Sequence, residues 1–221
     1  MLRSEFHADL QKLQDDLLNL GSMVEKATTK AIDALKTRDL PLSRQVIEED
    51  DVIDDIRYEI EARCEDLIAK QQPLATDLRL IIAIMHIVGE LERIGDYAEG
   101  VAKISLAMGD EAPLKPLIDI PRMAQKASLM TRQSLDALVE RDVDLAITVA
   151  ESDDEVDALY DQIFRELVTF MIEDPRTIQR ATYLLWVAHD LERIADRATN
   201  IAERVVYLVT GELSKLKEIF P

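Results

Sequence analysis

The chain has 221 residues, of which 48% are hydrophobic and 5% aromatic, and its formal net charge at pH 7 is −18. A chain of this length can bury one large core or two small ones. Its charge would repel phosphate backbones and anionic lipid, which argues against a protein that binds nucleic acid or adsorbs to a membrane surface. Cations and basic protein surfaces are the partners that this charge favours.

Hydrophobic residues recur at helical spacing through the first half, and capping residues and prolines divide it into three segments. Ser4 is a candidate N-cap of the first helix and Asp39 of the second, where Pro41 suits the opening turn. The expected helices run from after Ser4 to about Lys36, from after Asp39 to about Lys70, and from about Ala75 to Met108.

Residues 109–120 contain Pro113 and Pro116 and are predicted to link the two halves of the chain. Three more helices are expected after this linker, over about Pro121–Glu140, Asp142–Glu173 and Pro175–Val209. The segment after Gly211 is expected to be frayed or to form a short separate helix.

The second half repeats the first. Leu91–Asp96 (L-E-R-I-G-D) returns as Leu191–Asp196 (L-E-R-I-A-D), and Asp50–Asp54 returns as Asp153–Asp157 in the same order. This duplication predicts an all-α protein made of two tandem antiparallel three-helix bundles, packed side by side or end to end. The expected units are residues 1–108 and 121–221, joined by the linker over 109–120.

Several features favour a cytoplasmic protein without a membrane span. The most apolar stretch, Leu80–Val88, is far shorter than the ~20 residues that a membrane helix needs. Glu5 and Asp9 interrupt the N-terminus before any apolar run, so no secretory signal is expected. Cys64 is the single cysteine, which suits a reducing compartment.

Each expected unit carries two pairs of acidic residues at a spacing of four, which places both members of a pair on one face of a helix. All four pairs border the apolar stripe of their helix, where a carboxylate is partly desolvated and needs a counter-charge. The pairs are Asp50 with Asp54, Glu92 with Asp96, Asp153 with Asp157, and Glu192 with Asp196.

The second and third helices of a unit should be antiparallel neighbours, so their acidic pairs are expected to face each other across a groove. Such a group of carboxylates suits Mg²⁺, Ca²⁺, Mn²⁺, iron or Zn²⁺. In the second unit Asn200 is a further candidate oxygen ligand, whereas its counterpart is Gly100. The second site is therefore expected to be the more complete of the two.

The alternative interpretation is that the acids form salt bridges with arginines close in sequence, namely Arg57, Arg93, Arg165 and Arg193. A carboxylate-bridged multinuclear metalloenzyme and a purely structural helical adaptor are the other functions that the pattern leaves open. The sequence has no glycine-rich phosphate loop, no nucleophile–base pair and no paired E-x-x-H motif of ferritin-like di-iron oxidases, so an enzyme is not expected.

On these motifs the sequence resembles the PhoU family of phosphate-specific transport accessory proteins over nearly its whole length. The pattern E-R-I-x-D-x-A-x-N-I-A-E is met from Glu192 to Glu203, whereas the first copy has Gly100 for the asparagine and Lys103 for the last glutamate. The resemblance implies a cytoplasmic negative regulator of phosphate uptake and of the phosphate-starvation response.

The same resemblance implies partners and cofactors. It places the protein between the ATPase subunit of a phosphate ABC transporter and a membrane-bound, phosphate-sensing histidine kinase. It also implies a homodimer, and iron or zinc clusters on the acidic motifs.

Overall fold

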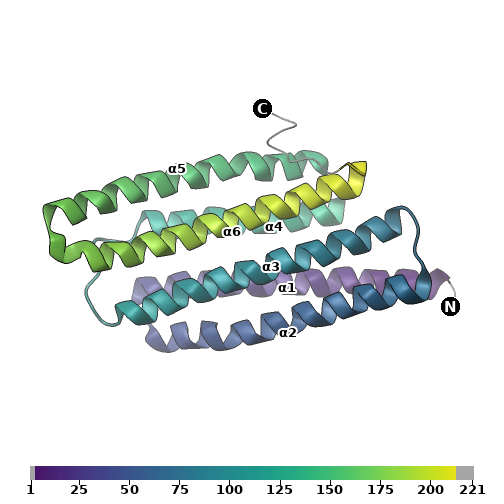
Figure 1. Ribbon diagram of the computed structural model, residues 1–221, viewed down its shortest axis with the longest axis horizontal. Helices are drawn as coiled ribbons and strands as arrows, with labels where there is room; N and C mark the ends of the chain where they lie inside the picture. The colour runs from purple at the N-terminus through teal and green to yellow at the C-terminus, as the bar shows by residue number, and fades with distance from the viewer. Residues whose placement is uncertain (1–2, 213–221) are drawn as a thin grey trace.

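The computed structural model describes residues 3–212, which form six long α-helices, a 3₁₀ turn and no strand (Figure 1). The elements are α1 (Arg3–Thr37), α2 (Leu40–Gln71), α3 (Thr76–Met108), α4 (Asp119–Glu140), α5 (Val143–Glu173), the 3₁₀ turn η1 (Pro175–Thr177) and α6 (Ile178–Thr210). The segment expected after Gly211 lies almost wholly outside the described residues. None of the described helices is long and apolar enough to cross a membrane.

Equivalent aspartates cap the second helix of each unit. The Asp39 carboxylate accepts a hydrogen bond from the Leu42 backbone N–H at 2.9 Å, and Asp142 accepts one from Leu145 at 3.0 Å. The expected cap at Asp39 is thus confirmed. The expectation for Ser4 is wrong, because α1 already includes Arg3 and a residue within a helix does not have the non-helical backbone of a cap.

The junction between α5 and α6 differs slightly from the expectation of a single helix starting at Pro175. The chain first makes the turn η1, in which Asp174 accepts a hydrogen bond from the Arg176 backbone N–H at 3.1 Å. The Thr177 hydroxyl then donates to the Phe170 carbonyl at 2.9 Å, which ties the turn to the end of α5. The regular helix α6 begins only at Ile178.

The two three-helix units lie side by side, with all six helices roughly along the long axis of the molecule (Figure 1). Within each unit, consecutive helices are antiparallel. Between the units α3 packs along α6 and, less extensively, α1 packs against α4. The duplication expected from the sequence is therefore present, and of the two arrangements considered the structure has the side-by-side one.

Polar contacts between α3 and α6 hold the units together unequally. Glu90 accepts hydrogen bonds from Arg197 at 3.2 Å and from Asn200 at 3.0 Å. At the repeat-equivalent place Asp190 lies against Gly100, where a Cβ would approach the Asp190 Oδ2 to 2.8 Å. Burial raises the pKa of Asp190 to about 6. Asn200 thus donates its amide N–H to the other unit. That it also offers an oxygen ligand to the second groove stays a prediction.

Candidate metal centre

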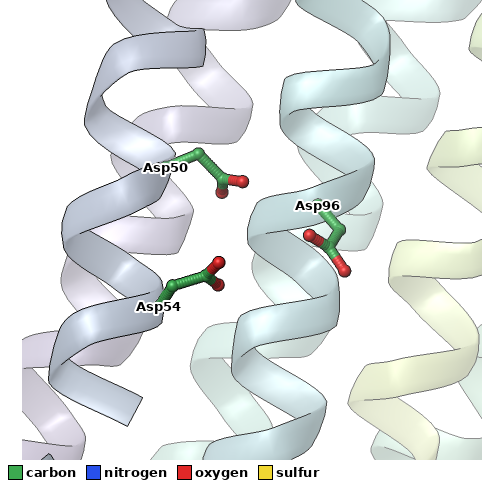
Figure 2. Close-up of side chains that lie close together, drawn as sticks. All are labelled: Asp50, Asp54 and Asp96. Carbon is green, nitrogen blue, oxygen red and sulfur yellow. The ribbon is translucent and has the colours of Figure 1, made fainter. Parts of the chain in front are cut away.

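Three aspartates of the first unit come together between α2 and α3 (Figure 2). Asp50 and Asp54 lie one turn apart on the face of α2 that packs against α3, and Asp96 lies across from them on α3. One carboxylate oxygen of each lies within 4.8 Å of the others. We call Asp50, Asp54 and Asp96 the aspartate cluster.

The aspartate cluster contains a buried carboxylate, Asp50, on which the positive charge of Lys103 acts while Lys103 itself pairs with Glu99. Asp50 is only 9% exposed, and among the described residues it has neither a hydrogen-bond donor nor an ion-pair partner. Asp54 Oδ1 is likewise buried with no donor among these residues. Gly95 makes room for Asp50, because a Cβ there would lie 2.9 Å from its Oδ1. A buried carboxylate in this state costs free energy unless a cation neutralises it.

The burial and mutual proximity of these carboxylates also raise the pKa values of Asp50 and Asp96. Burial, followed by the negative charges of Glu99, Asp96 and Asp54, raises the pKa of Asp50 to about 7, although the charge of Lys103 opposes this. Burial also raises the pKa of Asp96, followed by the charges of Asp54 and Glu99. Carboxylates that hold protons this firmly are those that gain most from a bound metal ion.

Glu92, the fourth acid predicted for this site, is next to the aspartate cluster but has its own partner. Arg57 donates to Glu92 at 2.9 Å and to Glu61 at 3.1 Å. The pKa of Glu92 is still raised, by burial first and by the charge of Asp96, although Arg57 opposes this. Glu92 is therefore already neutralised in part.

Sequence reasoning missed Glu99, whose charge acts on both Asp50 and Asp96 and which forms an ion pair with Lys103. Its position three residues after Asp96 places both on one face of α3, and that spacing would have revealed it.

The acids of the second unit are arranged differently. Asp153 is 3% exposed, and its charge, after burial, contributes to the raised pKa of Asp196. Arg193 donates to Asp196 Oδ2 at 2.9 Å and contacts Glu192 Oε2 at 3.1 Å, while His189 lies 3.4 Å from Glu192. Asp157 is exposed.

Within residues 3–212, a cluster of three carboxylates as close as the aspartate cluster occurs only in the first unit. This reverses the expectation that the second site is the more complete. The salt-bridge interpretation describes Glu92, Glu192 and Asp196, which contact arginines, but it does not describe the aspartate cluster. Arg93 and Arg165 contact other acids, Glu90 and Asp161, each at 3.8 Å.

The all-carboxylate donor set of the aspartate cluster fits a hard or borderline cation. Oxygen donors from two helices can be shared by one or more ions, and such ions would give Asp50 the direct cationic partner that it lacks among the described residues.

A family model for the PhoU domain matches the chain twice, over residues 17–105 and 120–205. A relative from Clostridium acetobutylicum, named phosphate-specific transport system accessory protein PhoU homolog, is 42% identical over 219 residues, which are 99% of this chain and 100% of that protein. A relative of the same name from Pseudomonas aeruginosa is 41% identical over 225 residues, covering 98% of this chain and 93% of the relative.

Two crystal structures have the same architecture. That of PhoU from Pseudomonas aeruginosa matches with a TM-score of 0.89 at 41% identity, covering 94% of this chain and 100% of the other. That of the phosphate transport system regulatory protein PhoU from Streptococcus pneumoniae matches with a TM-score of 0.88 at 32% identity, covering 95% and 99%.

Proposed function

The chain belongs to the PhoU family, and we propose that it is a metal-binding accessory protein that regulates phosphate uptake. Its relatives carry the name of a phosphate transport accessory protein over almost their full lengths, and both units match the family model. These relatives are named as accessory proteins rather than as enzymes, which fits a role exercised through binding.

The aspartate cluster is the observation that carries the metal-binding part of this proposal. Asp50, Asp54 and Asp96 would hold the ion, with Glu92 and Glu99 beside them. Its support is the buried carboxylate of Asp50, which has no hydrogen-bond donor or ion-pair partner among the described residues. Following the family resemblance we propose iron or zinc, and an all-oxygen donor set also suits Mg²⁺, Mn²⁺ or Ca²⁺. The bound ion supplies positive charge that fixes α2 against α3.

The regulatory part concerns protein partners. We place the chain as a cytoplasmic adaptor, acting as a homodimer, between the ATPase subunit of a phosphate ABC transporter and a phosphate-sensing histidine kinase. The names of the relatives support an association with transporter components. The net charge of −18 suits basic surfaces on such partners.

Elemental analysis tests the metal. Protein purified without chelators should contain iron or zinc in a fixed ratio to chain, and the double variant Asp54→Asn/Asp96→Asn should lose most of it. The control is Asp51→Asn/Asp55→Asn, which removes the same charge from exposed positions of α2. Equal metal in all three proteins, or none in the wild type, would show that the cluster is not a metal site.

A binding assay with purified components tests the adaptor role. The immobilised chain should bind the ATPase subunit of the phosphate ABC transporter from the same organism, and separately the cytoplasmic part of the histidine kinase. The ATPase subunit of an unrelated ABC importer serves as the control. Failure to bind either partner, in both metal-loaded and metal-stripped form, would refute the adaptor role. It would not affect the conclusion that elemental analysis gives about metal binding.

A further inference from the structure

The arginine of the repeated L-E-R-I-x-D motif makes different contacts in its two copies. Arg93 and Arg193 occupy the same place in L-E-R-I-x-D. Arg193 turns into its site and contacts Asp196 at 2.9 Å and Glu192 at 3.1 Å. Arg93 is 57% exposed, and its contact is Glu90, 3.8 Å away. Among the described residues no arginine forms an ion pair with the aspartate cluster of the first unit, whereas Arg193 neutralises part of the acids of the second unit.

One difference between α2 and α5 accompanies the two arrangements. Arg57 of α2 neutralises Glu92, so Arg93 is not drawn inward. The repeat places Tyr160 at the position equivalent to Arg57, and a tyrosine offers no positive charge. Glu192 therefore takes its cation from its own helix, and Arg193 supplies it.

The side chain of Arg193 is less accessible to water than that of Arg93. The side chain is 35% exposed, compared with 57% for Arg93. Its Nε is buried with no hydrogen-bond partner among the described residues. An arginine side chain stays protonated in proteins, so the guanidinium of Arg193 is charged where it contacts the two carboxylates. It thus occupies the electrostatic place that a bound cation would fill.

We propose that Arg193 is an internal counter-cation that competes with metal in the second unit, so that the first unit binds metal more tightly. This inference rests on the metal-binding function proposed above. A metal ion can use Asp196 and Glu192 only after Arg193 leaves them, and the affinity of the second site is lowered by the free energy of those contacts. Two partly buried ion pairs lower it roughly tenfold.

The test is a calorimetric titration of metal-stripped protein with Mn²⁺. In the Asp54→Asn/Asp96→Asn background the first site is disabled, and the titration reports on the second. Adding Arg193→Met, which keeps an apolar stem for packing, should raise the Mn²⁺ affinity about tenfold. Adding Arg93→Met instead removes the same charge from the equivalent position and should change the affinity less than twofold.

An equal gain from the two arginine variants would overturn the proposal, because net charge alone would then explain it. So would an unchanged affinity with Arg193→Met in protein that remains helical by circular dichroism. The wild type tests the underlying function separately: absence of any Mn²⁺ binding there would contradict metal binding itself.

Discussion

Replacing Asp50 by asparagine should stabilise the metal-free protein at alkaline pH. The side chain keeps its shape but cannot ionise, and its amide can donate to the carboxylates of Asp54 and Asp96. Burial first, and then the neighbouring carboxylates, raise the pKa of Asp50 from its ordinary value of 3.8 to about 7. The folded state therefore holds this proton more tightly than the unfolded state does.

The direction and size of the stabilisation expected from Asp50→Asn follow from the difference in proton binding between the folded and unfolded states. Below about pH 3.8 Asp50 is protonated in both states, so its burial has no pH-dependent cost. Between that pH and about 7 the unfolded state ionises first, and the stability of the wild type falls as pH rises. Above about pH 7 the full cost is present, roughly 4 kcal/mol if Asp50 carries it alone. We expect Asp50→Asn to recover about half of this or more.

Urea unfolding with a chelator present, followed by circular dichroism at pH 8 and at pH 4, measures the effect. The stabilisation by Asp50→Asn should be about 2–4 kcal/mol at pH 8 and close to zero at pH 4. Asp51→Asn, at an exposed position next to it on α2, serves as the control and should show no such difference. The same destabilisation by Asp50→Asn at both pH values would refute the reasoning, since the carboxylate would then be satisfied in the folded protein.

Three further predictions concern other parts of the fold. Asn200→Ala removes the hydrogen bond to Glu90 between the units and should cost about 1 kcal/mol in urea unfolding, with no loss of metal on elemental analysis. Gly21→Ala should destabilise by about 1–3 kcal/mol, because its Cβ would collide with a leucine of α4, whereas Gly89→Ala, with open space around it, should stabilise by up to about 1 kcal/mol. Asp142→Ala removes the N-cap of α5 and should lower the melting temperature, at a cost of about 1 kcal/mol, and an unchanged melting temperature would contradict its capping role.

The helices and the duplication were predictable because they depend on local signals. Apolar residues at helical spacing, the capping Asp39 and the prolines of the linker set the helix boundaries to within a few residues. The repeated motif then indicated two similar units. These signals act within one helix or turn, so a single sequence carries them in full.

The pairing of individual acids was less predictable because it depends on contacts between distant residues. The sequence indicated which acids face the groove, but the partner of Glu92 is on another helix, and Arg57 could equally have faced solvent. The role of Asn200 depends on the packing of α3 against α6, which brings it to Glu90 from far along the chain. The contact of Arg193 with Asp196 depends on the side-chain conformation of Arg193, which the spacing of residues in the sequence does not determine.

Anomalous X-ray diffraction from crystals of the metal-bearing protein, collected at the absorption edges of iron and zinc, tests the central claim most directly. The account predicts that the strongest anomalous peak lies between α2 and α3, in contact with the carboxylates of Asp50, Asp54 and Asp96. Metal-loaded crystals in which the anomalous scatterer lies elsewhere, with no peak at these three carboxylates, would contradict it.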